Sequence, residues 1–190
     1  MRVYGKGPVP CDTALVGPYV GYEEDRTGIP FSGRSGQELD RYLNGMDLPN
    51  RADIYLTNLH KDYRGRDYVY SVEDTQLATP ILLKELERVQ PTTLITMGRE
   101  VTRLFLGDVD ITDVEGIPWT DPTNPDRVIF PLVHLAAGMR NPEWSPYVVR
   151  GFQALSSFFA GKLDVRTLFD DPIKEPHYEE ITSESRLRDL

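Results

Sequence analysis

Four short apolar runs, rich in β-branched residues, divide the chain into segments of different character. They occupy residues 13–16, 54–56, 93–97 and 128–133. Runs of this length and composition predict strands that are buried inside a domain. The chain is therefore expected to contain a sheet of strands that lie far apart in the sequence.

Apolar residues at helical spacing fall between these runs. Leu39, Leu43 and Met46 recur at i, i+4 and i+7, and another apolar face follows a candidate capping box at Ser71–Asp74. The remaining helical faces are formed by Ile81, Leu82, Leu86 and Val89; by Val101, Leu104 and Phe105; and, from about Pro146 to a stop at Gly161, by Val148, Phe152, Leu155 and Phe159. Strands that alternate with helices predict a three-layer α/β/α fold whose mostly parallel sheet is covered on both faces.

Glycine and polar residues follow each of the four predicted strands. They occupy residues 17–25, 57–61, 98–100 and 134–142. Ligands of open α/β sheets bind in the crevice outside the carboxyl ends of the strands, so these four loops are expected to converge on one pocket. The first loop continues through further glycines to Gly36, and glycine lets a backbone approach a ligand closely.

The acidic composition limits the ways in which the chain can bind a partner. Its formal net charge is -9 and its pI is near 4.8, whereas proteins that bind polyanions by bulk electrostatics carry a basic excess. Any contact with nucleic acid is therefore expected to be local. The single cysteine, Cys11, excludes an internal disulfide. No transmembrane run or signal peptide is visible, so we expect a cytoplasmic monomer without membrane partners.

The ordered motifs of the chain resemble those of a known family. These motifs are Gly17–Asp25, Gly28–Phe31 with Gly33–Gly36, Thr57–Asn58, Met97–Arg99 and His134–Pro142. In order and spacing they are similar to the uracil-DNA glycosylase superfamily, most closely its iron–sulfur bacterial branch. The resemblance implies a four-stranded parallel sheet between helices, which binds DNA and cuts the N-glycosidic bond of an extruded base. It covers a domain of residues 1–161, and residues 162–190 are expected to form an acidic arm or tail.

The same resemblance assigns roles around an extruded base, which has to be held by stacking and by hydrogen bonds to its edge. Phe31 would stack on the base, and the amide of Asn58 would read its edge. His134 would donate a hydrogen bond to the departing base and stabilise its negative charge. The base-binding wall would be completed by Gly17, Tyr19 and Gly21. The alternatives are a core phenylalanine, a turn asparagine and a strand-end histidine.

Other residues in these motifs are candidates for binding DNA outside the base pocket. Met139 or Arg140, followed by Asn141, could wedge into the groove and fill the space of the extruded nucleotide. The candidates for contacts with the phosphate backbone are Arg34, Lys61, Arg64, Arg66, Arg99 and Arg140. The alternatives are a solvated charged loop around Lys61 and an ordinary helix-entry loop at Met139.

The chain departs from the iron–sulfur branch at the cluster. Asp62 and Ala78 stand where that branch has two of its four cysteines, and the positions of the other two lie before the chain begins. No cluster, metal or other cofactor is therefore expected. Packing is expected to brace this surface instead, with Tyr63, Tyr68 and Tyr70 as candidates.

The first motif departs too, because Pro18 and Tyr19 follow its first glycine where the family usually has an acidic or amide residue. Glu24 or Asp25 could orient the attacking water instead, and the alternative is a structural pairing with a nearby arginine. Gly21 occupies the position at which branches strict for uracil have a bulky tyrosine. A pyrimidine enlarged at C5 could therefore enter, unless Gly21 is merely a turn glycine.

The sequence thus predicts a monofunctional DNA glycosylase that removes a uracil-like or C5-enlarged pyrimidine and leaves an abasic site. The altered first motif and the acidic charge keep a second hypothesis open, a non-catalytic module that binds DNA or a nucleotide on the same fold. A small-nucleotide enzyme would fit the sheet but would not explain residues 139–142.

Overall fold

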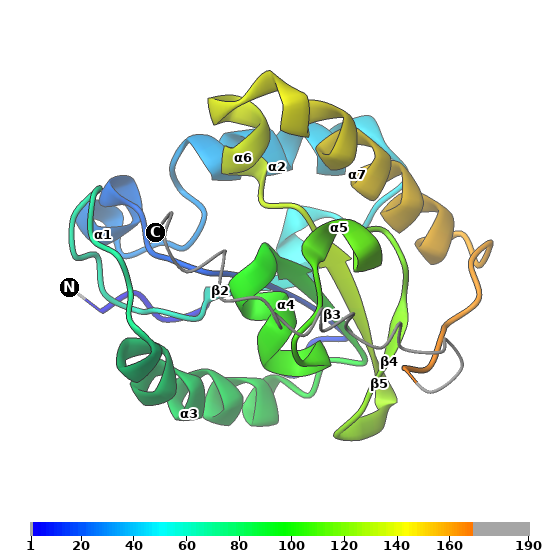
Figure 1. Cartoon of the computed structure of the whole chain (residues 1–190), viewed down its shortest axis with the longest axis horizontal. Coiled ribbons are helices and arrows are strands. Elements are labelled where there is room, and N and C mark those ends of the chain that lie inside the picture. Colours follow the sequence, from blue (N-terminus) through cyan, green and yellow to red (C-terminus); the bar gives the residue numbers. More distant parts are fainter. Residues whose placement is uncertain (1, 169–190) are drawn as a thin grey trace, which may run out of the picture.

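A five-stranded sheet lies at the centre of the protein, and a computed structural model describes residues 2–168 of it (Figure 1). The strand order is β2-β1-β3-β5-β4. The strands are β1 (Thr13–Gly17), β2 (Ile54–Asn58), β3 (Thr93–Met97), β4 (Trp119–Asp121) and β5 (Asn124–Leu132). The four predicted strands are present and parallel to one another. The expected count of four was one too low, because the short β4 pairs antiparallel to β5 and has no apolar run.

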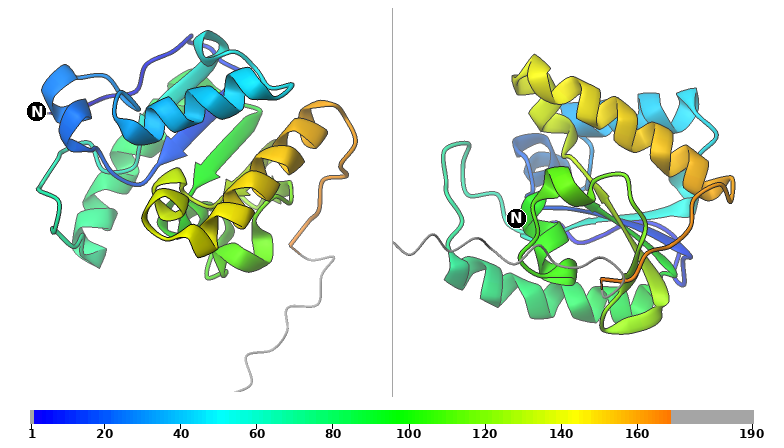
Figure 2. Two further views of the ribbon diagram at one scale, coloured as in Figure 1. Left: turned by 90° about the horizontal axis from the view of Figure 1, so that it is seen from above. Right: turned by 45° about the vertical axis from the view of Figure 1, so that its right-hand side comes forward.

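Helices cover both faces of the sheet. Their bounds are α1 Tyr22–Thr27, α2 Arg34–Gly45, α3 Val72–Val89, α4 Arg99–Leu106, α5 Ile111–Val114, α6 Leu135–Arg140 and α7 Ser145–Phe159, with 3-10 turns at Arg51–Asp53 and Pro142–Trp144. Figures 1 and 2 show α2 and α7 over one face and α3, with α4 beside it, over the other. This arrangement agrees with the right-handed crossovers that parallel strands require. The predicted three-layer α/β/α architecture is confirmed.

Local signals explain why two of these helices lie where they do. The predicted capping box begins α3, since Ser71 Oγ accepts from the Asp74 amide at 3.1 Å and Asp74 Oδ2 accepts from the Ser71 amide at 2.9 Å. The apolar stripe of α7 includes Phe152, which is fully buried and stacks on Tyr42 of α2 with ring centroids 4.2 Å apart. The two helices over this face are thus held together by one aromatic contact.

A buried ion pair joins β2 to α3. Lys61 Nζ donates to Glu85 Oε2, and both side chains are more than nine-tenths buried. The remaining oxygen of Glu85 accepts from the hydroxyl of Tyr55 at 2.9 Å and from the amide of Gly5 at 2.6 Å. Lys61 also donates to Thr57 Oγ1 at 2.6 Å. The prediction that Lys61 contacts DNA phosphate was therefore wrong, because its ammonium group is committed to this network inside the fold.

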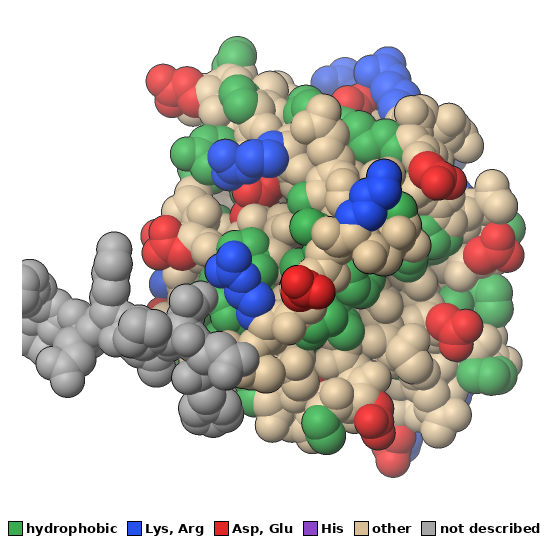
Figure 3. Space-filling view, turned by 90° about the vertical axis from the view of Figure 1, so that its right-hand side faces the viewer, with side chains coloured by type: hydrophobic (Ala, Val, Ile, Leu, Met, Phe, Trp, Pro, Cys, Tyr) green, Lys and Arg blue, Asp and Glu red, His purple; other side chains and the backbone are tan. Residues whose placement is uncertain are grey.

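Charged side chains of both signs are present on the surface (Figure 3). Figure 3 shows acidic and basic side chains scattered among apolar and uncharged ones on one face. In the described part of the chain, no helix is long and apolar enough to cross a membrane. After α7 the chain returns to the sheet edge, where Arg166 exchanges backbone hydrogen bonds with Pro118 and Thr120. Most of the predicted acidic arm, residues 169–190, lies outside the described residues.

Removal of one partner of the buried ion pair is expected to be costly. Lys61→Ala leaves the Glu85 carboxylate buried and uncompensated, and should lower the free energy of unfolding by about 3–5 kcal/mol. Arg103→Ala breaks an exposed ion pair with Asp108 and should cost less than about 1 kcal/mol. Urea unfolding of both variants tests this difference. An equal decrease in the free energy of unfolding for both variants would show that the Lys61–Glu85 pair contributes no more than an exposed ion pair.

Candidate active site

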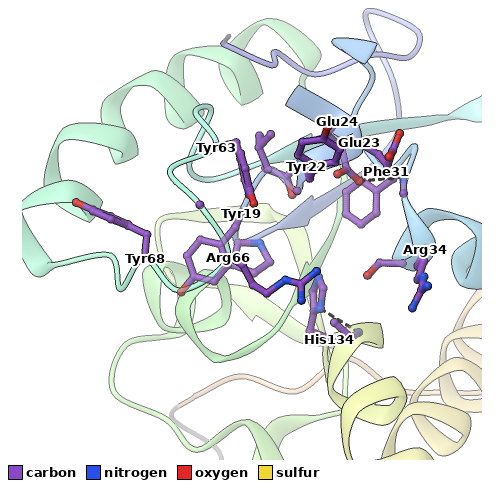
Figure 4. Close-up of a pocket in the computed structure, with 18 of the residues that line it drawn as sticks. Tyr19, Tyr22, Glu23, Glu24, Phe31, Arg34, Tyr63, Arg66, Tyr68 and His134 are labelled. Carbon is purple, nitrogen blue, oxygen red and sulfur yellow. Dashed lines mark hydrogen bonds between the residues drawn. The ribbon is translucent and has the colours of Figure 1, made fainter. Parts of the chain in front are cut away.

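One cavity of about 830 Å³ opens at the carboxyl ends of the parallel strands (Figure 4). Its lining comes from the segments that follow β1, β2, β3 and β5, as the arrangement of glycine and polar residues predicts. The site residues expected from the sequence that line it are Tyr19, Gly21, Glu24, Phe31, Arg34, Asn58, His134 and Arg140. The fold therefore brings together residues that are more than 120 positions apart in the chain.

Phe31 and Asn58 meet over Gly17, the last residue of β1. Gly17 pairs with Asn58 across the sheet, so the Asn58 side chain lies directly beside it. A Cβ on Gly17 would be 2.4 Å from Asn58 Oδ1 and 2.8 Å from Phe31 Cζ. Both distances are shorter than a side-chain carbon tolerates. Position 17 thus has to be glycine for these two side chains to share one end of the cavity.

The backbone of Phe31 is held in a conformation that a bulky residue seldom adopts. Its φ angle is +55°, in the left-handed region, and its carbonyl oxygen accepts from Arg51 Nη2 at 2.8 Å. The N-terminal turn of α2 packs against the same carbonyl, where a Cβ on Gly36 would lie 1.7 Å away. Strain of this kind persists only where the surroundings enforce it, and it concentrates at functional sites. The surroundings hold the Phe31 ring against Gly17 and the cavity.

Asn58 is buried, with 3% of its surface exposed, yet its amide has no hydrogen-bond partner among the described residues. Its polar atoms are not among the fully buried side-chain atoms that lack partners in the described chain, so they are open to the cavity. The group faces the cavity, where a ligand can offer both a donor and an acceptor. This combination indicates a residue that reads a polar edge.

His134 is fixed as a neutral imidazole by its position at the start of α6. Its Nδ1 accepts from the amide of Ala136 at 3.1 Å, so the proton of the neutral ring is on Nε2. Burial lowers the pKa of His134 to about 4, and the positive charge of Arg140 adds to this shift. Nε2 has no partner among the described residues. The site therefore presents one uncharged N–H donor to the cavity.

Glu24 and Asp25, the two candidate carboxylates, differ in placement. Glu24 is buried and lines the cavity, and its Oε1 accepts from the Gly33 amide at 3.1 Å. A Cβ on Gly21 would lie 2.4 Å from Glu24 Oε2, so this glycine makes room for the carboxylate. Asp25 does not line the cavity. The geometry thus favours Glu24 over Asp25 as the acidic group of the site.

Tyr19 forms one wall of the cavity through contacts with two other loops. Its ring stacks on the ring of Tyr70, with centroids 4.6 Å apart. The ring centroid of Tyr70 in turn lies 4.0 Å from that of His60. The hydroxyl of Tyr19 donates to Glu100 at the start of α4. Burial, and then the charge of Glu100, raise the pKa of Tyr19 well above its usual value. Tyr19 is thus an ordered wall rather than a replacement for the missing acidic residue.

Comparison with known proteins places this arrangement in a family. The sequence profile described as the uracil DNA glycosylase superfamily matches residues 5–156. The chain belongs to this superfamily. A type-4 uracil-DNA glycosylase of Thermotoga maritima is 30% identical over 143 residues, which cover 73% of this chain and 72% of the relative. Similar proteins of the same description occur in Saccharolobus solfataricus (26% identical, 84% of this chain and 77% of the relative) and Pyrobaculum aerophilum (28%, 90% and 87%).

Membership of this superfamily makes the chain a DNA glycosylase, as its motifs predict. The resemblance to the iron–sulfur branch raises the question of a cluster, and the residues present do not fit one. Cys11 is the sole cysteine, and its thiol is buried where it donates to the carbonyl oxygens of Thr13 and Asp53. Asp62 is paired with Arg2 at 3.6 Å. Among the described residues, no three side chains of His, Cys, Asp or Glu are grouped to hold a metal.

Packing braces the loop of residues 61–71 instead. The hydroxyl of Tyr70 donates to the carbonyl oxygen of Asp62 at 2.8 Å, and the hydroxyl of Tyr68 donates to Asp74 Oδ2 at 2.9 Å. Arg64 pairs with Asp74 at 2.7 Å. The proposed bracing by Tyr68 and Tyr70 is present in the structure. Because Arg64 is engaged in it, this guanidinium is less available to DNA than the sequence suggested.

The other expected DNA contacts divide into two groups. Arg34, Arg66 and Arg140 line the cavity and have no hydrogen-bond partner among the described residues. Arg99 and Met139 are exposed outside the cavity lining, and their roles stay predictions. Asn141 caps the following 3-10 turn, where its Oδ1 accepts from the Glu143 amide at 3.0 Å. Three arginines without hydrogen-bond partners among the described residues thus lie around this cavity.

Sequence reasoning missed Tyr22 and Glu100, which also line the cavity, and assigned Tyr63 only a bracing role. Tyr22 and Tyr63 are 41 positions apart, and no periodic pattern connects them. Glu100 follows the Met97–Arg99 motif directly, so its position beside a strand end was the available signal.

The close approach at Gly17 gives a test of the site. Gly17→Ala is expected to push Asn58 and Phe31 apart, and a misplacement of this size should lower kcat/KM for base release by about 100-fold. Gly45→Ala in α2 is the matched control, because nothing lies within 4 Å of its added methyl group. This control should keep full activity and unfold at the same temperature or higher. Unchanged activity of Gly17→Ala would contradict the assigned geometry.

Proposed function

We propose that the protein extrudes a pyrimidine from DNA and hydrolyses its N-glycosidic bond, which leaves an abasic site. The observation that carries this proposal is the convergence of Phe31, Asn58 and His134 on one cavity, where the Asn58 amide and the Nε2–H of His134 have no partner among residues 2–168. The names of the type-4 relatives support uracil as a substrate. A base inside a duplex is inaccessible, so it has to leave the stack to reach these residues.

The base is recognised through the face of its ring and through its hydrogen-bonding edge. Phe31 supplies a fixed aromatic surface on which the pyrimidine ring stacks. The Asn58 amide pairs with the polar edge of the base, and this pairing satisfies a group that is otherwise unpaired in the interior. Because an amide carries one acceptor and one donor group, it can face a uracil-like or a cytosine-like edge. Arg34, Arg66 and Arg140 hold the flanking phosphates around the cavity mouth.

Bond cleavage is assisted by stabilisation of the departing base. As the glycosidic bond breaks, negative charge develops on the pyrimidine and the sugar becomes oxocarbenium-like. The Nε2–H of His134 donates to the pyrimidine oxygen on which this charge accumulates. A neutral donor is available at physiological pH because the pKa of His134 is about 4. The fixed tautomer means that no reorganisation of the ring is needed during the reaction.

The water that attacks the sugar is oriented by Glu24. Its carboxylate is the buried acidic group of the cavity, and one oxygen is held by the Gly33 amide while the other stays free. Pro18 supplies no side-chain acceptor where the family usually has one. Lys61, Glu85 and the tyrosines of the 61–71 loop stabilise the region around Asp62, which stands where the iron–sulfur branch has a cluster cysteine.

Loss of the His134 donor should abolish most of the activity. His134→Asn keeps an N-cap acceptor for α6 but removes the Nε2–H, and base release should fall by about 100- to 1,000-fold. Asn58→Ala should also lose most cleavage. Wild-type release should stay constant down to about pH 5 and decline as the pH nears 4, because protonation of His134 at Nδ1 removes the acceptor for the Ala136 amide that orients the ring.

These rates are measured by cleavage of labelled oligonucleotides at abasic sites. If the wild type binds DNA but releases no base from any substrate, the enzyme proposal fails. The alternative of a non-catalytic binding module, which the altered first motif favours, would then stand.

The substrate range includes pyrimidines enlarged at C5. The support is the cavity volume of about 830 Å³, which lies within the range of about 300–1,000 Å³ for sites of drug-sized ligands and exceeds the needs of one pyrimidine. Gly21 adds no bulk to the cavity, although its close contact with Glu24 is a second reason for glycine there.

Oligonucleotides that contain uracil, a 5-hydroxymethyl pyrimidine or its glucosylated form distinguish these possibilities. We expect the wild type to release the enlarged bases, because the cavity has space beyond the pyrimidine ring, and mass spectrometry identifies each product. His134→Asn, which lacks the leaving-group donor, serves as the control for every substrate. Release of plain uracil alone would contradict the enlarged-base proposal and leave the glycosylase proposal intact.

A further inference from the structure

Five tyrosines line the cavity, and three of them are parts of its wall. The hydroxyl groups of Tyr19, Tyr68 and Tyr70 donate to Glu100, to Asp74 and to the carbonyl oxygen of Asp62. The rings of the three also contact one another, since Tyr70 stacks on Tyr19 and meets Tyr68 edge-on at 4.9 Å. The hydroxyl groups of these three side chains all have partners within the fold.

Tyr22 and Tyr63, the other two, are different. Their rings meet edge to face with centroids 6.1 Å apart, and neither hydroxyl has a hydrogen-bond partner among residues 2–168. Tyr22 is 64% exposed and Tyr63 is half-buried. Figure 4 shows the two rings side by side at the cavity, with Phe31 beyond Tyr22. The pair thus leaves aromatic surface open at the cavity, most of it on Tyr22.

Unpaired positive charge accompanies this pair. Arg66 comes from the same loop as Tyr63, and Arg34 begins the helix that follows Phe31. Both line the cavity and have no partner among the described residues. Aromatic rings that alternate with guanidinium groups are suited to nucleic acid, because bases stack on the rings while phosphates contact the charges.

The geometry points to Tyr22 and Tyr63 as a stacking subsite for the base next to the extruded one, available when that neighbour is unpaired. This inference rests on the proposed function for the place of the extruded base between Phe31, Asn58 and His134. The cavity continues from that place to the tyrosine pair, so a nucleotide adjacent in the same strand can reach it. In a duplex the neighbouring base stays paired and stacked. The subsite therefore favours single-stranded DNA.

The test compares four oligonucleotides that carry the same target pyrimidine. One is an intact single strand, two are single strands with an abasic tetrahydrofuran in place of the nucleotide on one side or the other of the target, and one is a duplex. Affinity is measured by fluorescence anisotropy, and base release is measured separately. The variants are Tyr22→Ala, Tyr63→Ala and Tyr22→Phe. Tyr4→Ala is the matched control, since Tyr4 is 51% exposed and does not line this cavity.

We expect the wild type to lose about tenfold in affinity for the single strand when the adjacent base is missing on one side. The Tyr22→Ala and Tyr63→Ala variants should bind the intact single strand with an affinity that is also lower by about tenfold. Removal of the adjacent base should then lower their affinity little further. On duplex DNA their change should be smaller than about twofold. Tyr22→Phe keeps the ring, so it should bind as the wild type does, and so should Tyr4→Ala.

An affinity that does not depend on the adjacent base, or alanine variants that lose equally on single-stranded and duplex DNA, would overturn the inference. The binding measurements do not depend on catalysis. A wild type that releases no base but retains the neighbour effect would contradict the proposed function and support the subsite. Release of the base without any effect of the adjacent base on affinity would support the proposed function and contradict the subsite.

Discussion

The close approach of Phe31 and Asn58 over the bare backbone of Gly17 is the constraint on which the active site depends. Hydrogen bonding between β1 and β2 fixes the register that puts Asn58 beside Gly17, and the packing of Gly36 against the Phe31 carbonyl fixes the ring from the other side. The two contacts bring an aromatic ring and an amide to the same end of the cavity. The strained φ angle of Phe31 is maintained by this packing and by Arg51.

The polar groups of the site are held in fixed orientations, and they belong to a chain with a net negative charge. His134 is neutral because it is buried near Arg140, and its tautomer is set by the first turn of α6. The proposed chemistry therefore relies on one oriented N–H donor rather than on a charged acid. In the proposed function, DNA affinity relies on a few arginines at the cavity that have no partner among the described residues, because the net charge of -9 opposes any broader attraction. This placement concentrates attraction where the extruded nucleotide enters.

The region around Asp62 shows how the fold compensates for residues that a cluster would need. Lys61 and Glu85 connect β2 to α3 in the interior, while Tyr68 and Tyr70 tie the 61–71 loop to its surroundings. The sequence suggested the tyrosines but assigned Lys61 to the surface. That error has a simple cause, because a lysine in a loop rich in charge gives no local sign of the distant carboxylate that buries it.

The sequence by itself determined the layers, the four parallel strands and the loops that carry the site, because apolar periodicity and strand-end residues are local signals. It also identified Phe31, Asn58 and His134 through ordered motifs. Only the tertiary structure separated Glu24 from Asp25, added β4 to the sheet, buried Lys61 and joined Tyr22 to Tyr63. The last two depend on contacts between segments far apart in the chain, and such contacts are set by packing rather than by neighbours in sequence. β4 is joined to β5 by a short turn, and it was missed because it has no apolar run.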